Sequence, residues 1–269
     1  MTTNPAPTTL HIARRIPLNL GRVEHVNLTL VGCGGTGSFL ALHLARLAWH
    51  AGEQHGIDVH LTFVDPDHIE DRNVGRQNFV PAEVGLMKAE RLACRYGLAF
   101  GSSIRFFNEP LEPAHVADDH RYRDGWLHLV VGAVDNTAAR RDVESIVAGW
   151  GGRLWWLDCG NHDHSGQVLL GNAGDVDGPQ INPMGFCTGL PWPSVQCPEL
   201  IREEAAPPVS CAEAALDDAQ SLMVNQMVAG WAAGYVYRLV VARDLDVHAT
   251  YFDLRSGSAR SEYIEDGRL

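Results

Sequence analysis

The stretch LTLVGCGGTGSF, residues 28–39, places four glycines between an apolar run and the start of a helical pattern. Residues 28–31 are typical of a buried strand, and residues 38–49 carry apolar side chains at helical spacing. A glycine turn between a strand and a helix points backbone N–H groups at a ligand, and the helix dipole favours negative charge there. The stretch therefore predicts a phosphate-binding turn, in which Gly32, Gly34 and Gly37 match G-x-G-x-x-G and Gly35 is a further glycine of the turn.

Strand-like and helix-like segments alternate through the first 160 residues. The periodicity predicts helices at 85–96 and 137–149 and further strands at 59–64, 104–107, 127–131 and 154–157. Strand–helix–strand units pair their strands in parallel through right-handed crossovers. The alternation therefore predicts an α/β fold with a doubly wound, mostly parallel, Rossmann-like sheet.

The remainder of the chain is expected to complete a single domain over residues 1–269, after an N-terminal arm at 1–24. Residues 171–208 are rich in proline and predict a long crossover that serves as a lid or a partner-binding loop. Residues 212–269 predict an apolar helix or helix pair up to residue 241, followed by an alternating strand at 245–251. Gly230 and Gly234 are the candidate interruptions of that helix, and the strand would form an antiparallel C-terminal extension.

Composition excludes several classes of partner. The formal charge of −12 argues against a nucleic-acid surface, because binding phosphate backbones needs clustered Lys and Arg. Residues 1–9 lack the pattern of a signal peptide, and no apolar run reaches the length of a membrane span, so we expect a cytoplasmic protein without a membrane partner. None of the six cysteines forms a CxxC pair, which argues against a structural zinc.

The residues after the second strand bear on which phosphate ligand is bound. Asp65 ends that strand and is placed to accept hydrogen bonds from a ribose. A carboxylate that ends a strand and only contacts water would give the same sequence pattern. The following segment carries two cations, Arg76 and Lys88, on an otherwise acidic chain. A redox dinucleotide has little use for them, whereas nucleotidyl transfer needs charge stabilisation on the leaving pyrophosphate. Alternatively, the two cations are ordinary surface charges near the start of a helix.

A second acid lies just past the strand expected at 127–131. Asp135 would stand at the carboxyl edge of the sheet, where open α/β folds bind ligands, and with ATP it could hold Mg²⁺ against the phosphates. Alternatively, Asp135 and Asn136 cap the next helix, and the two roles are compatible.

At this point the chain resembles a known family. Residues 28–140 are similar to the ThiF, MoeB and ubiquitin-activating-enzyme superfamily, with VGCGGTG, VDPDHIEDRNVGRQ, GLMKAE and VDNTAAR in the family's order. Later stretches, WLDCGNHDHSGQVLLG and SCAEAALDDAQSLMVNQMVAG, extend the resemblance, in particular to the ThiF-related proteins of bacterial ParB-related, ThiF-related (PRTRC) cassettes.

The resemblance implies an activity and a set of roles. The family binds ATP with Mg²⁺ and adenylates the C-terminal carboxylate of a ubiquitin-like carrier protein, which releases pyrophosphate. By resemblance, Asp65 holds the ribose, Asp135 the magnesium, and Gln77 supports its neighbour Arg76. Arg76, Lys88 and Asn73 are expected to bind the phosphates, and Asp67 and Asn136 complete the expected nucleotide-binding set.

The resemblance also implies partners. The carrier would arrive in trans, and the protein would be a homodimer in which Arg14 or Arg15 reaches the partner's phosphates. Cys211 aligns with a cysteine that links to the activated carrier in some relatives, although a small apolar role before an alanine-rich helix is the alternative. Two rival functions stay open. One is an NAD- or FAD-dependent oxidoreductase, supported by the same glycine turn and Asp65, and the other is a non-enzymatic scaffold that keeps the nucleotide pocket.

Overall fold

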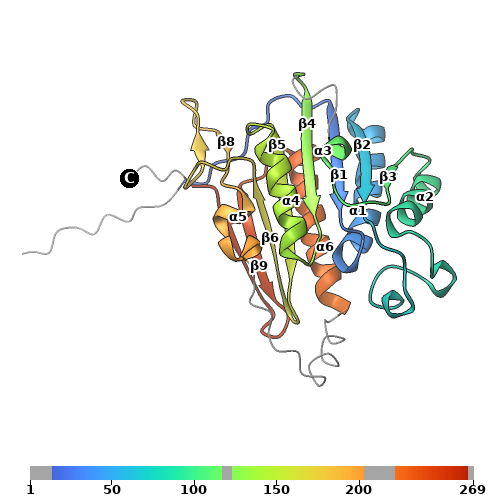
Figure 1. Cartoon of the computed structure of the whole chain (residues 1–269). Coiled ribbons are helices and arrows are strands. Elements are labelled where there is room, and N and C mark those ends of the chain that lie inside the picture. The colour runs from blue at the N-terminus through green and yellow to red at the C-terminus, as the bar shows by residue number, and fades with distance from the viewer. Residues whose placement is uncertain (1–13, 117–122, 203–221, 266–269) are drawn as a thin grey trace, which may run out of the picture.

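The computed structural model describes residues 14–116, 123–202 and 222–265 (Figure 1). Its centre is an eight-stranded sheet in the spatial order β10-β9-β6-β5-β4-β1-β2-β3. Five neighbouring strands of this sheet are parallel: β1 (His25–Val31), β2 (Asp58–Val64), β3 (Arg105–Phe107), β4 (Trp126–Gly132) and β5 (Leu154–Asn161). The predicted doubly wound, mostly parallel sheet is confirmed.

Helices cover both faces of the sheet, as Figure 1 shows for α4 and α6. The larger core lies under α1 (Gly35–His55), α2 (Lys88–Phe100) and α6 (Leu222–Tyr237). The smaller core lies on the opposite face under α3 (Pro113–Val116) and α4 (Thr137–Ala148). Side chains of a strand alternate between faces, so the near-continuous apolar runs of β1 and β4 reflect burial on both sides.

The sheet continues beyond β5 with antiparallel strands, as the sequence predicts for its C-terminal end. β6 (Ser165–Gly171) returns beside β5, and β9 (Val247–Asp253) and β10 (Ser258–Tyr263) follow it outward. Periodicity did not predict β6, because its sequence SGQVLLG has glycine at its second and last positions and resembles a loop. It did not predict β10 either, whose residues are polar and largely exposed at the sheet edge.

The proline-rich connection contains several short elements in its described part. These are β7 (Gln180–Ile181), β8 (Cys187–Gly189), α5 (Pro193–Gln196) and η3 (Pro198–Ile201). Leu200 is buried against Leu169 of β6 and Ala249 of β9, so this part packs onto the sheet. A lid or partner-binding role for the connection stays a prediction.

The helix expected over 212–241 is seen from Leu222 onward, and its first ten residues lie outside the described part of the chain. α6 runs into a π-helical turn, η5 (Arg238–Ala242), and neither Gly230 nor Gly234 interrupts it. Burial of one stripe of α6, including Val228 and Val236, offsets the low helix propensity of glycine.

Two other helix starts differ from their predicted positions. α1 begins at Gly35 inside the glycine turn, three residues before its predicted start at residue 38. α2 begins at Lys88 rather than at residue 85, because Gly85 has a φ of +88° and closes the turn after η2 (Pro81–Glu83). No helix in the described ranges is long and apolar enough to cross a membrane.

Candidate functional site

A polar cavity lies where the carboxyl ends of β1, β2, β4 and β5 meet the start of α1. It brings together the glycine turn, the segment after β2 and the residue that follows β4, with additional residues from β5 and α6. The lining residues are Gly32, Gly34, Gly35, Thr36, Asp65, Asp67, Arg76, Gln77, Lys88, Ala133, Val134, Asp135, Cys159, Asn161 and Asn225. This is the edge of the sheet at which open α/β folds bind ligands.

The turn needs glycine at two positions for packing reasons. A Cβ atom at Gly37 would lie 1.8 Å from the carbonyl oxygen of Gly32, so α1 can approach the turn only without a side chain there. Gly32 has a φ of +87°, and its Cβ would lie 2.6 Å from the carbonyl oxygen of Ala133. The close fit between β1, the turn and the end of β4 therefore depends on both residues. It leaves the first amides of α1 at the cavity, where they suit phosphate.

Asp65 ties the end of β2 to this turn. One carboxylate oxygen accepts a hydrogen bond from the Cys33 amide at 2.5 Å, and the other accepts one from the Asp67 amide at 2.8 Å. Burial raises the pKa of Asp65, and the two amide hydrogen bonds work against that rise. Each carboxylate oxygen has the capacity to accept one more hydrogen bond, so Asp65 can hold the turn and still accept from a ribose.

The Lys88 ammonium is the buried cation of the cavity. It lies 2.9 Å from a carboxylate oxygen of Asp67, and the Lys88 amide donates to the Asp67 carbonyl at 3.0 Å. The Lys88 side chain is 8% exposed, whereas that of Asp67 is 64% exposed. Asp67 thus compensates a charge that burial would otherwise disfavour.

Arg76 and Gln77 reach the cavity from the turn that follows η1 (Asp71–Asn73). Their amides donate to the Asn73 carbonyl at 3.2 and 2.9 Å, and the Asn73 side chain accepts from the Glu70 amide at 2.9 Å. Gln77 Oε1 is buried and has no hydrogen-bond partner among the described residues. Asn73 shapes this turn and is not among the lining residues given above, so its contact with a phosphate stays a prediction.

Asn78 fixes this segment to both neighbouring helices. Its amide donates to the Ser38 hydroxyl of α1 at 2.9 Å, and its side chain donates to the Tyr96 hydroxyl of α2 at 2.8 Å. Arg95 of α2 donates to the Asn78 carbonyl at 2.8 Å. Arg76 and Gln77, just before Asn78, are thereby held over the glycine turn.

Glu83 ion-pairs with two arginines of α2 and so holds the same segment against that helix. Its side chain is 3% exposed and accepts hydrogen bonds from Arg91, at 2.5 Å, and from Arg95. Burial alone would raise the pKa of Glu83, but these hydrogen bonds outweigh it and hold the pKa below its ordinary value. Because the partners lie 8 and 12 positions away on α2, spacing in the sequence did not single them out.

The structure assigns the helix-capping role that the sequence left open to Asn136, whereas magnesium binding by Asp135 and nucleotide binding by Asn136 stay predictions. The Asn136 side chain accepts from the Ala139 amide at 2.8 Å and is the N-cap of α4. It also donates to an Asp135 oxygen at 3.3 Å. Asp135 lines the cavity with an exposed carboxylate, the donor type that Mg²⁺ takes alongside waters and phosphate oxygens. The residues present thus fit a nucleotide-bound magnesium.

Comparison with known families agrees with this arrangement. The model of the ThiF family matches residues 11–265. The chain belongs to the ThiF family. No curated protein sequence gives a match.

Solved structures share the fold of this ThiF-family chain at low sequence identity. The structure of E. coli MccB with ATP has a TM-score of 0.57 and 16% identity, covering 92% of this chain and 66% of that one. Selenomethionyl PaaA has a TM-score of 0.54 and 19% identity, covering 90% and 64%. MccB in complex with N-formylated MccA has a TM-score of 0.54 and 16% identity, covering 90% and 66%. The chain spans less than two thirds of the length of these structures.

Two asparagines of the ThiF-family cavity were missed in the sequence. Asn225 of α6 is 4% exposed, and its side-chain oxygen accepts hydrogen bonds from Asn161 at the end of β5 and from the Thr36 hydroxyl at 3.3 Å. A Cβ at Gly35 would lie 2.8 Å from the side-chain amide nitrogen of Asn225, so α6 packs closely against the turn here. The available signal was Asn225 itself, a polar residue within the apolar stripe of α6.

The cysteines of the site are not poised as nucleophiles. Cys33 and Cys159 are buried, and burial raises the pKa of both thiols. A thiol held protonated is a poor nucleophile. Cys211, the predicted nucleophile, lies outside the described residues, and its role stays a prediction.

The N-terminal arginines of this ThiF-family chain lie away from its own cavity. Arg15 stacks on the Tyr263 ring with its guanidinium carbon 3.5 Å from the ring centroid, and the Ile16 amide donates to the Ile264 carbonyl at 2.8 Å. Arg14 is exposed. A contribution from either arginine to a partner's cavity stays a prediction.

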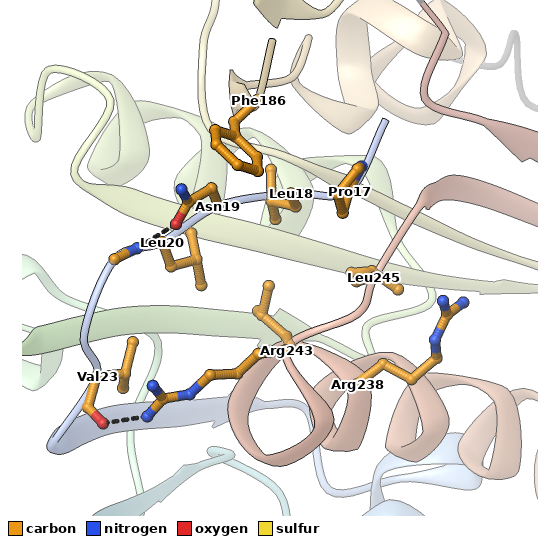
Figure 2. Close-up of a pocket in the computed structure, with 11 residues that line it drawn as sticks. Pro17, Leu18, Asn19, Leu20, Val23, Phe186, Arg238, Arg243 and Leu245 are labelled. Atoms are coloured by element: carbon orange, nitrogen blue, oxygen red, sulfur yellow. Dashed lines mark hydrogen bonds between the residues drawn. The ribbon is translucent and has the colours of Figure 1, made fainter. Parts of the chain in front are cut away.

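A second cavity lies between residues 17–23 and the chain from η5 to Leu245, and Figure 2 shows its lining. Arg243 donates to the Val23 carbonyl at 2.6 Å, and the Asn19 side chain accepts from the Gly21 amide at 2.8 Å (Figure 2). Arg238 is ion-paired with Asp244 at 2.9 Å and Asp246 at 2.8 Å. The Arg243 contact, together with the Leu18 amide that donates to the Leu245 carbonyl at 2.8 Å, fixes residues 17–23 to the residues after η5, so we interpret this cavity as a gap between two packed segments.

Proposed function

We propose that this ThiF-family protein is an ATP-dependent adenylyltransferase that activates the C-terminal carboxylate of a ubiquitin-like carrier protein and releases pyrophosphate. One observation carries the proposal: Arg76, Lys88 and Asp135 line the same cavity as the glycine turn. Two cations and an exposed acid are what a triphosphate with magnesium requires, and an intact dinucleotide has little need of them.

The site residues would divide the nucleotide between them. Asp65 would accept from the ribose hydroxyls, and the first amides of α1 would meet the phosphates at the glycine turn. Magnesium, when bound at Asp135, would neutralise phosphate charge. Gln77 Oε1 is buried and unpartnered among the described residues, which suits a group that accepts a hydrogen bond from the ligand or supports Arg76.

The reaction would be an in-line displacement. A carboxylate oxygen of the carrier attacks the α-phosphorus, the bond from that phosphorus to the β-phosphate oxygen breaks, and pyrophosphate leaves with the electron pair. The product on the carrier is an acyl adenylate. Arg76 and Lys88 would stabilise charge on the departing pyrophosphate. The ion pairs of Glu83 with Arg91 and Arg95 would hold these two cations in position.

The carrier would arrive in trans, in keeping with the family and with MccB, which has been solved with its partner MccA. A homodimer, in which Arg14 or Arg15 completes the neighbouring cavity, and acyl transfer to Cys211 belong to the same proposal. Membership of the PRTRC cassettes and a cytoplasmic location remain expectations from the sequence.

An exchange assay tests the proposal. With ATP, Mg²⁺ and small proteins that end in glycine, labelled pyrophosphate should enter ATP only when a carrier is present. Thermal unfolding separates the rival functions, because ATP with Mg²⁺ should raise the melting temperature and NAD or FAD should not. Stabilisation by NAD or FAD alone would favour the oxidoreductase. ATP binding without exchange or carrier adenylate, across all carriers tested, would favour the scaffold.

A further inference from the structure

Three potential metal ligands meet at the opposite end of the sheet from the nucleotide cavity. His25 begins β1, and its Cα partner on the parallel strand β2 is Asp58. His60 follows Asp58 by two residues, so it projects from the same face of β2. The register of two strands therefore gathers two imidazoles and one carboxylate.

Their spacing suits a single ion. Asp58 Oδ2 lies 3.0 Å from His60 Nε2 and 3.6 Å from His25 Nδ1, and the three ligand atoms all lie within 4.8 Å of one another. Two ligands bound tetrahedrally to one zinc at about 2.0–2.1 Å are separated by about 3.3 Å. The two distances to Asp58 fall on either side of that separation.

His25 Nδ1 supplies a second observation. This atom is enclosed, yet at 3.6 Å from Asp58 it is beyond hydrogen-bond distance and has no hydrogen-bond partner in the described residues. A ring nitrogen that lies close to a carboxylate oxygen without bonding it is available to an ion that both atoms bind.

Trp126 holds both rings in place. It begins β4 beside His25, and its ring stacks with His25 at 4.7 Å between centroids and with His60 at 5.5 Å. The interplanar angles are 15° and 12°. Because the two imidazoles are already oriented, binding an ion costs less side-chain entropy.

We propose that His25, Asp58 and His60 bind a divalent transition metal of zinc's class, with water as the remaining ligand. Two imidazoles favour such an ion over Mg²⁺ or Ca²⁺, which prefer oxygen ligands. The side chains are 40%, 60% and 45% exposed, so water reaches the open position. The site lies about 20 Å from the glycine turn, six residue steps along β1. The ion would therefore link β1 to β2 without touching the nucleotide.

Zinc binding to the full chain tests the proposal. After chelator treatment, equilibrium dialysis against Zn²⁺ at neutral pH should show one tight equivalent, and Zn²⁺ should raise the melting temperature without ATP. Asp58→Asn and His60→Gln should each weaken this binding by about tenfold or more. Both residues are exposed, so the zinc-free melting temperature should stay unchanged.

The matched control is the double variant His50→Gln, His55→Gln. These two rings on α1 lie 5.2 Å apart and represent a histidine pair outside the proposed site. The control should keep the tight equivalent. Zinc affinity that survives both Asp58→Asn and His60→Gln, or that falls equally in the control, would overturn the site. A loss of zinc binding would leave pyrophosphate exchange unaffected, so this result is separable from the adenylyltransferase proposal.

Discussion

The ammonium of Lys88 lies 2.9 Å from a carboxylate oxygen of Asp67, joining a side chain that is 8% exposed to one that is 64% exposed. The two ends of this ion pair are therefore not equivalent. Removing the buried cation leaves an acid that water can solvate, whereas removing the acid leaves a charge shut away from water.

This asymmetry predicts different outcomes for two variants. Lys88→Met keeps the side-chain volume, so the free energy of unfolding should change little, whereas ATP affinity should fall by about tenfold or more with the lost charge-assisted contact. Asp67→Asn should lower the free energy of unfolding by about 1–3 kcal/mol. Chemical denaturation and calorimetric ATP titration measure both effects. Equal destabilisation in the two variants would argue against the asymmetric pair.

Asp135 and Asn136 are neighbours with separate expected effects. Asp135→Ala removes an exposed carboxylate from the cavity, so carrier-dependent pyrophosphate exchange should be abolished while the melting temperature holds. Asn136→Ala removes the N-cap of α4 and should lower the free energy of unfolding by about 1 kcal/mol, an effect that Asp135→Ala should not show. Exchange near the wild-type rate in Asp135→Ala would remove the metal assignment.

Much of the cavity was predictable because parallel strands end at one edge of a sheet. Asp65 and Asp135 follow buried strands, and the glycine turn follows a third, so recognising the strands already placed these residues together. Lys88 was singled out differently, as a cation in the segment after the second strand and by resemblance to the family, and the helix that it begins starts three residues later than predicted.

The rest depended on contacts between distant parts of the chain. Asn225 meets Thr36 across 189 positions, a contact that only the packing of α6 on α1 creates. Likewise β6 was missed because its pairing with β5 and β9, rather than its own composition, makes it a strand. Side-chain networks and antiparallel edges carry little local signal, so periodicity did not find them.

Gly37 should be intolerant of any side chain. A Cβ there would lie 1.8 Å from the Gly32 carbonyl oxygen, so Gly37→Ala should cost about 3 kcal/mol and weaken ATP binding as the turn shifts. Gly230→Ala is the matched control, because a Cβ at Gly230 on α6 meets no atom within 4 Å. It should raise stability by about 0.5–1 kcal/mol through helix propensity. Similar unfolding curves for both variants would refute the close approach.

The Glu83 pair with Arg91 and Arg95 predicts a pH dependence of stability. The folded pKa of Glu83 is lowered, so its contribution is present above the unfolded pKa of about 4.3 and is lost as pH falls through the folded value. At pH 7, Glu83→Gln should therefore cost about 3 kcal/mol, because two arginines lose their charged partner.

The difference in unfolding free energy between wild type and Glu83→Gln, measured from pH 7 down to pH 3, should shrink toward the acid end. Protonation of Glu83 makes the wild-type side chain neutral, as the glutamine already is, and the two proteins then hold the arginines in the same way. Because Arg95 also donates a hydrogen bond to the Asn78 carbonyl, ATP affinity should fall with the same pH profile. A difference that stays constant over this range would mean that Glu83 acts through shape rather than charge.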